Sequence, residues 1–257
     1  MRKKNQLKRK IAHGDYVIGT WCTLPSPSVI NVLGASGLDF VIIDMEHGPT
    51  DFVTAEDMIR SAESEECSPL IRVPSNNESD ILRALDIGAH GIIVPNIESV
   101  DDREKAVSYI KYPPSGIRGF SPYTRAGNYS NLDSNYTAKE NKEIMTVLIV
   151  EGIEGLKNLE GIINDPQIDV IYIGTYDLSQ AIGKPGKVNH IQVKEELEEC
   201  VKKIRNHGKA AGCLIHNRNE LQWFTEIGIQ FITYLVDNAV LFNDFSNMKK
   251  ELDKIIE

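Results

Sequence analysis

Eight short apolar segments recur along the chain, and longer amphipathic stretches separate them. Most are apolar at consecutive positions, which is typical of strands buried on both faces of a parallel sheet. The segments are residues 17–21, 40–43, 70–73, 91–94, 147–150, 170–174, 211–215 and 231–236. We therefore predict eight parallel strands.

The stretches between these segments have helical periodicity. Residues 51–64 open with Asp51, a capping residue, and residues 77–87 are followed by Gly88, which favours a helix end. Further helices are predicted over residues 99–110, 153–163, 193–206, 220–227 and 239–256. Strands alternating with helices over this length are typical of a (β/α)₈ barrel. We find no GxGxxG motif after the first strand and no linker, so we predict an α/β chain with one TIM barrel domain, residues 1–257.

One segment breaks the alternation. Residues 112–136 are rich in Pro, Gly, Ser, Asn and Tyr, and they are too long for an ordinary connection. Because the segment follows a helix, it should leave from the amino-terminal rim of the barrel, opposite the usual active site. It is either a packed surface loop or a contribution to a neighbouring subunit's site.

Composition narrows the classes of partner. The chain has 28 Lys and Arg against 37 Asp and Glu, a formal net charge of −9. This balance argues against nucleic acid or an anionic membrane as the main partner, although an anionic substrate stays possible. No apolar run approaches the roughly 20 residues of a membrane span. The basic residues 1–10 lack the apolar region of a secretory signal, and the four cysteines lack a metal-binding spacing, so we expect a reduced, cytoplasmic protein.

Ionisable residues follow six of the eight predicted strands. In a barrel the carboxyl ends of all strands meet at one mouth, so the repetition indicates a site there. Any one of these residues alone could be a helix cap or a rim ion pair, and Asp177 could simply cap the next helix. The residues are Asp44, Glu46, His47, Arg72, Glu151, Asp177, His216 and Asp237.

The types of these residues suggest a reaction. Glu151 and Asp177 are the best metal ligands, since two carboxylates without cysteine suit Mg²⁺ or Mn²⁺. His47 is the best acid or base, because imidazole titrates near neutral pH. Arg72 can stabilise negative charge on an enolate oxygen. Together they describe carbon–carbon bond chemistry on a metal-chelated 2-oxoacid.

Several segments, in order along the chain, match a known family. The most specific are IDMEH at residues 43–47 and YPPSGIRG at residues 112–119. Further matches are residues 19–21, 37–48, 69–72, 84–89 and 173–179. On these segments the chain resembles the HpcH/HpaI class II aldolases, which cleave 4-hydroxy-2-oxoacids to pyruvate and an aldehyde.

This resemblance implies a metal-dependent barrel with Mg²⁺ or Mn²⁺, or Co²⁺, held by Glu151 and Asp177. It implies His47 as the base, Asp86 as its partner and Asp44 as an anchor of the site. The substrate-binding residues it implies are Trp21, Arg72, Gly174, Thr175, Tyr176, Phe120 and Leu214. Backbone groups of residues 174–177 would bind the pyruvate carboxylate.

Phe120 and Leu214 would line the aldehyde pocket, and Phe120 would come from an adjacent subunit. A homo-oligomer is also implied, a hexamer built as a trimer of dimers or a smaller form. We expect the last predicted helix to take part in oligomer packing.

The chain departs from the family pattern at four places that bear on the second substrate. Thr175 and Tyr176 replace a Pro-Ala pair, Ile149 replaces a Gln, His216 replaces a small residue, and Phe120 replaces a smaller aliphatic residue. We predict a lyase that performs reversible retro-aldol cleavage of a 4-hydroxy-2-oxoacid, with His47 taking the C4 hydroxyl proton directly or through a water.

Three alternatives stay open. One is a lyase of the citrate or malyl-CoA type, which would need a basic patch for the nucleotide phosphates. Another is a decarboxylating relative, and a third is a catalytically silent barrel with a binding role. A Schiff-base aldolase is disfavoured because no Lys follows a predicted strand.

Overall fold

Eight parallel strands close into a barrel in the computed structural model, which describes residues 5–256. Each strand pairs with its neighbours in chain order, and β8 pairs with β1 to complete the ring. The strands are β1 (Val17–Cys22), β2 (Phe40–Asp44), β3 (Ser68–Arg72), β4 (Gly91–Ile97), β5 (Met145–Val150), β6 (Val170–Ile173), β7 (Ala210–Ile215) and β8 (Ile229–Val236). The predicted (β/α)₈ barrel is confirmed.

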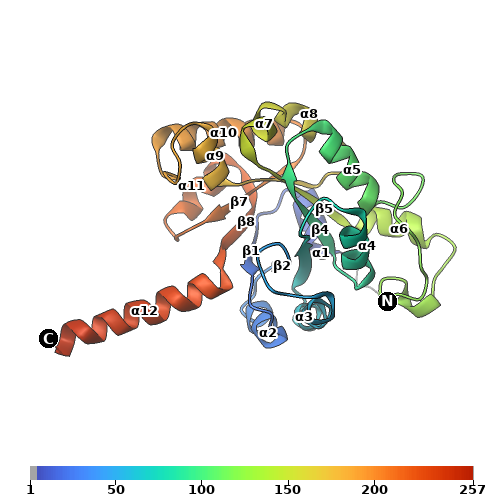
Figure 1. The fold of residues 1–257 in the computed structure, drawn as a ribbon, viewed down its shortest axis with the longest axis horizontal. Coiled ribbons are helices and arrows are strands. Elements are labelled where there is room, and N and C mark those ends of the chain that lie inside the picture. Colours follow the sequence, from blue (N-terminus) through green and yellow to red (C-terminus); the bar gives the residue numbers. More distant parts are fainter. Residues whose placement is uncertain (1–4, 257) are drawn as a thin grey trace.

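Helices follow the strands and surround the barrel (Figure 1). They are α1 (Gln6–His13), α2 (Pro27–Ala35), α3 (Phe52–Ser64), α4 (Glu78–Asp86), α5 (Val100–Ile110), α6 (Tyr136–Glu143), α7 (Gly152–Lys157), α8 (Leu159–Ile163), α9 (Thr175–Ala181), α10 (Ile191–Asn206), α11 (Glu220–Ile227) and α12 (Asp237–Ile256), with a 3₁₀ turn, η1 (Asn128–Ser130).

Several differences from the sequence prediction concern the helices, and α6 and α9 were not predicted. The helix predicted over residues 153–163 is two helices, α7 and α8, which meet at Asn158. The sequence analysis also missed α2, although Ser26 caps it and Pro27 occupies its first turn, both of which are recognised start signals. The basic amino-terminal segment forms α1 from Gln6 onward, and residues 1–4 lie outside the described part.

Two apolar clusters divide the core. One lies between the strands and the surrounding helices. The other fills the barrel interior with side chains such as Phe40, Leu70 and Phe231, and Leu7 and Ile11 of α1 pack against its amino-terminal end. The interior is therefore a packed core, and space for a ligand lies only toward its ends.

The 112–136 segment lies at the amino-terminal rim, as predicted. It connects α5 to α6 and is held against the carboxyl end of α4, where the Ala126 amide donates to the Asp86 carbonyl at 3.0 Å. The mouth formed by the carboxyl ends of the strands lies at the opposite end of the barrel.

Three remaining features concern the rest of the chain. The last helix, α12, extends away from the barrel (Figure 1). Within residues 5–256 no helix combines the length and apolarity that a membrane crossing requires. All four cysteines are buried and free.

Candidate active site

A cavity of about 500 Å³ opens at the carboxyl ends of the strands. It gathers most of the residues that the sequence analysis had selected. Its lining includes Trp21, Asp44, His47, Arg72, Glu151, Gly174, Thr175, Tyr176, Asp177 and Leu214. Glu151 and Asp177 share this cavity, which is the juxtaposition that a common metal ion would require.

Arg72 is fixed at the cavity by the parallel register of its strand. Residue Asp44 at the end of β2 pairs directly with Arg72 at the end of β3. The guanidinium donates through Nε to Asp44 Oδ1 at 2.9 Å and through a second nitrogen to Asp44 Oδ2, and its third nitrogen lies 3.0 Å from Glu46. Such a bidentate pair sets both the position and the plane of the guanidinium.

Asp44 also shapes the loop that carries His47. Its Oδ1 accepts hydrogen bonds from the backbone amides of Glu46 at 3.1 Å and His47 at 3.2 Å. One buried carboxylate therefore holds both the arginine and the start of the histidine loop. The sequence analysis expected Asp44 to anchor the site, and that functional role stays a prediction.

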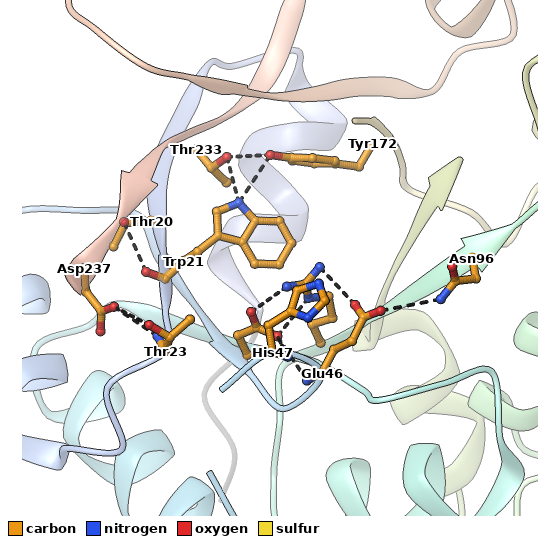
Figure 2. A network of polar contacts seen from close by, with 11 residues as sticks. Thr20, Trp21, Thr23, Glu46, His47, Asn96, Tyr172, Thr233 and Asp237 are labelled. Atoms are coloured by element: carbon orange, nitrogen blue, oxygen red, sulfur yellow. Dashed lines mark hydrogen bonds and ion pairs between the residues drawn. The ribbon is translucent and has the colours of Figure 1, made fainter. Parts of the chain in front are cut away.

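An aromatic side chain covers the same guanidinium. The Arg72 guanidinium carbon lies 4.4 Å from the centroid of the Trp21 ring, within cation–π distance. Figure 2 shows the indole nitrogen pointing toward Thr233 and Tyr172. Neither Thr233 nor Tyr172 was selected from the sequence.

Glu151 lies in an acidic environment. Burial, followed by the nearby charges of Asp177 and Glu46, raises the pKa of Glu151 to about 7. Its Oε2 accepts the backbone amide of Asn96 at 3.2 Å. Within residues 5–256, no Lys, Arg or His forms an ion pair with Glu151 or Asp177. The cation in the cavity lining, Arg72, is paired with Asp44 and Glu46, so Glu151 and Asp177 form an acidic pair without an ion-pair partner in the described part of the chain.

These residues fit a hard divalent cation. Two carboxylates that repel each other in one cavity are oxygen donors of the kind that Mg²⁺ and Mn²⁺ prefer. Among the described residues no group of three or more His, Cys, Asp or Glu side chains is arranged to hold a metal. A cation bound here would thus take its remaining ligands from water and substrate oxygens, as magnesium commonly does.

Asp177 lies in the first turn of α9, whose N-cap is Gly174. No side-chain hydrogen bond caps the start of that helix, so Asp177 is not its N-cap residue. The metal-ligand role of Asp177 stays a prediction. An ideal Cβ on Gly174 would lie 2.7 Å from Asp177 Oδ2, so this carboxylate folds back against the Gly174 backbone.

His47 is exposed at the cavity, beside Glu46 (Figure 2). Among the described residues, none forms a hydrogen bond with its imidazole. Its expected partner, Asp86, is elsewhere: it ends α4 at the opposite rim and accepts a hydrogen bond from Arg118 at 2.9 Å. A contact between Asp86 and His47 within one chain is therefore excluded, because the length of the barrel separates them.

Phe120 likewise lies outside the cavity of its own chain. It packs against Tyr112 and Tyr136 in the 112–136 segment, with both ring centroids 5.8 Å away, and it is 51% exposed. The expected pocket role of Phe120 would need a second copy of the chain.

The remaining strand-end residues have structural partners. Glu220 accepts the backbone amide of His216 at 2.7 Å, and the His216 ring packs edge-to-face on Tyr176 at 5.6 Å. Asp237 starts α12 and accepts hydrogen bonds from residues at the end of β1.

Sequence reasoning missed Asn96. Its backbone has a φ of 57°, in the left-handed region that Asn tolerates better than most residues. This turn at the end of β4 directs its amide to Glu151 and its side chain toward Glu46, 3.5 Å away. The Pro-Asn pair at residues 95–96 is a turn signal that could have drawn attention to it.

Comparisons with known proteins identify a family for the chain. A family model described as HpcH/HpaI aldolase/citrate lyase matches residues 17–243. A pyruvate aldolase of Rhizobium etli is 33% identical over 92% of this chain and 93% of its own length. A 5-keto-4-deoxy-D-glucarate aldolase of Enterobacter sp. is 32% identical, with 92% of each chain covered.

Solved structures are also similar. A HpcH/HpaI aldolase/citrate lyase family protein from Burkholderia cenocepacia has a TM-score of 0.90 at 27% identity, covering 97% of this chain and 99% of its own. The citrate synthase SbnG has a TM-score of 0.87 at 29% identity, covering 98% and 99%. The chain belongs to the HpcH/HpaI aldolase/citrate lyase family. It is accordingly an enzyme of the aldolase and lyase type.

Proposed function

We propose that this enzyme is a class II aldolase that cleaves a 4-hydroxy-2-oxoacid reversibly to pyruvate and an aldehyde, with Mg²⁺ or Mn²⁺ as cofactor. The observation that carries the proposal is the single cavity shared by Glu151, Asp177, Arg72 and His47. The names of the two sequence relatives, a pyruvate aldolase and a sugar-acid aldolase, support this substrate class.

The first step requires a stabilised enolate. Glu151 and Asp177 would hold the divalent cation, which when bound acts as a Lewis acid on the oxoacid. Arg72 donates to the oxygen that gains negative charge as the C3–C4 bond breaks. Because Asp44 and Glu46 already fix the guanidinium, little reorganisation is needed at that moment.

His47 moves the proton. Its imidazole takes the proton of the C4 hydroxyl, the C3–C4 electron pair passes to C3, and the new carbonyl leaves as the aldehyde. Protonation at C3 then completes pyruvate. Gly174 and Thr175 line the cavity at the start of α9, where we place the pyruvate carboxylate.

Proton exchange tests this proposal without knowledge of the aldehyde. Purified protein incubated with pyruvate in D₂O should exchange methyl protons, measured by NMR, only when Mg²⁺ or Mn²⁺ is present. Arg72→Ala should lower the exchange rate about a hundredfold, because one oxyanion donor is lost. His47→Ala should lower it as well.

Arg60→Ala is the matched control, because Arg60 is an exposed arginine of α3 whose ion pairs with Glu56 and Asp57 lie on the surface. Absence of exchange with any metal would contradict the proposed function. A panel of aldehydes offered with pyruvate would then identify the second substrate.

A second candidate is carbon–carbon bond formation of the citrate synthase type. The observation that favours it is the likeness to SbnG over nearly the whole chain. The same cavity would serve, since an enolate would attack a second carbonyl group in place of an aldehyde. Enolate exchange without cleavage of any 4-hydroxy-2-oxoacid would favour this candidate over the aldolase.

A further inference from the structure

A buried hydroxyl lies behind the wall of the cavity. Thr233 on β8 is fully buried, and it is not among the residues that line the cavity. Its Oγ1 lies 3.1 Å from Trp21 Nε1, 2.6 Å from the Tyr172 hydroxyl and 3.5 Å from the Cys213 carbonyl. Figure 2 shows the contacts with Trp21 and Tyr172.

The Thr233 hydroxyl accepts a hydrogen bond from the Trp21 indole. A threonine hydroxyl has one donor and two acceptor positions, and the indole N–H can only donate. The proton of Thr233 goes either to the Cys213 carbonyl or to the Tyr172 oxygen, because either hydroxyl can donate in the Thr233–Tyr172 hydrogen bond. The Tyr172 oxygen lies 3.3 Å from Trp21 Nε1 and serves as a second, longer acceptor.

This network fixes the orientation of the Trp21 ring. The indole is anchored at its nitrogen, and its ring packs edge-to-face on Tyr172 with centroids 5.6 Å apart. The anchored ring in turn lies against the Arg72 guanidinium at 4.4 Å. Thr233 is thus linked to Arg72 through a single side chain.

The Trp21 indole restricts a movement of the Arg72 guanidinium that the carboxylates of Asp44 and Glu46 do not restrict. Asp44 and Glu46 hold the guanidinium through hydrogen bonds and an ion pair at its nitrogens. The Trp21 ring lies over the central guanidinium carbon, 4.4 Å from the ring centroid, and it blocks displacement of the group toward that ring. The ring therefore limits how far the Arg72 guanidinium can move on that side.

We propose that Thr233 is a positioning residue of this site, which aligns Arg72 through Trp21. This proposal rests on the proposed function, in which Arg72 donates a hydrogen bond to the enolate oxygen. Misplacement of a catalytic group by about 1 Å can cost a large factor in rate, so loss of a remote hydroxyl can lower turnover.

Thr233→Val removes the hydroxyl and keeps the branched shape. Thr146→Val is the matched control: Thr146 lies on β5, is fully buried, and its Oγ1 has no hydrogen-bond partner in the described part of the chain. Thr233→Ser restores the hydroxyl and should restore the wild-type values.

Two readouts separate positioning from a general structural role. The first is metal-dependent pyruvate exchange in D₂O. We expect Thr233→Val to lower kcat about tenfold while KM for pyruvate changes less, because the lost alignment matters most when charge develops. The second is the near-ultraviolet circular dichroism of Trp21, recorded in a Trp223→Phe background because the chain has two tryptophans. Thr233→Val should change this signal, whereas Thr146→Val should not.

Wild-type kcat together with an unchanged Trp21 signal in Thr233→Val would overturn the proposal. If that variant does not fold, Thr233→Ala replaces it, since it removes the same hydroxyl with a smaller side chain, and an unchanged Trp21 signal and kcat would again overturn the proposal. If the wild-type enzyme does not exchange the methyl protons of pyruvate with any metal, the result contradicts the proposed function and not the role of Thr233. The two failures are therefore distinguishable.

Discussion

At the scale of single residues, Glu151 is a site carboxylate whose pKa is raised, first by burial and then by the neighbouring carboxylates. An ordinary glutamate has a pKa near 4.5, and burial with the adjacent carboxylates raises that of Glu151 to about 7. Folded, metal-free protein therefore keeps a proton on Glu151 at pH values where the unfolded chain has lost it. The free energy of unfolding then decreases as pH rises from about 4.5 to 7, and this contribution stays constant above that range.

Glu151→Gln removes this titration. We expect the metal-free variant to lose less thermal stability than the wild type as pH rises through that interval, measured by differential scanning fluorimetry. At pH values above 7, Mg²⁺ or Mn²⁺ should raise the wild-type Tm and leave the Glu151→Gln Tm unchanged, because a ligand that binds only the folded state stabilises it.

Glu160→Gln, which alters an exposed carboxylate 3.7 Å from Lys203, should behave as the wild type does. A Glu151→Gln variant with a full metal-induced shift and full activity would exclude Glu151 as a metal ligand.

At the scale of elements, the junction between β8 and α12 connects the cavity to the rest of the molecule. Asp237 is buried at the first position of α12. Its carboxylate accepts from the Thr23 amide at 3.0 Å, the Thr23 hydroxyl at 3.1 Å and the Leu24 amide at 3.1 Å. Figure 2 shows the contact with Thr23, which itself lines the cavity. One carboxylate therefore holds the segment after β1 against the start of the last helix.

Asp237→Ala should leave the partly buried donors of Thr23 and Leu24 without this acceptor. We expect a loss of about 1–2 kcal/mol in the free energy of unfolding, measured by urea denaturation, because donors that lose their acceptor keep part of their desolvation cost. The KM for pyruvate should also rise as Thr23 moves. Asp244→Ala on the same helix changes an exposed carboxylate and should cost almost nothing. Equal stability of the two variants would show that the Asp237 contacts contribute little.

At the scale of the whole molecule, α12 has an apolar surface that its own barrel does not cover. The helix extends away from the barrel (Figure 1), and of its residues only Asp237 is buried. Exposed apolar side chains along it are Leu241, Phe242, Phe245, Met248, Leu252, Ile255 and Ile256. Contiguous exposed apolar surface of this kind marks a site of protein association. The expectation that α12 packs against a second copy of the chain therefore stays a prediction with a structural basis.

Replacing Phe242 and Phe245 by Ser tests whether α12 packs against a second copy of the chain. Both rings are more than 70% exposed, so their loss should leave the barrel intact. Light scattering coupled to size-exclusion chromatography should show an oligomer for the wild type and a shift toward the 28.7 kDa monomer for the double variant. A wild-type monomer, or an unchanged oligomer in the variant, would contradict the role of α12. A second copy would also be required to bring Asp86 or Phe120 to a cavity.

Much of the fold and the mouth of the barrel could be predicted from the sequence, for a physical reason. Strands covered on both faces must be apolar at consecutive positions, and a charge that directly follows such a strand needs a partner or a ligand. These two rules placed Asp44, Arg72, Glu151 and Asp177 at one end of the barrel before the structure was considered. The two faces of such strands look alike in sequence, however, so Tyr172 and Thr233 could not be assigned to the interior network.

The sequence by itself determined the strand count, the barrel class and which ionisable side chains follow the strands, because burial and helical periodicity are local patterns. Only the tertiary structure decided which of those side chains meet. Register paired Asp44 with Arg72, closure of β8 on β1 brought Thr233 to Trp21, and the length of the barrel separated Asp86 from His47. Contacts between residues distant in sequence depend on how strands align and where helices end, and no local pattern encodes those distances.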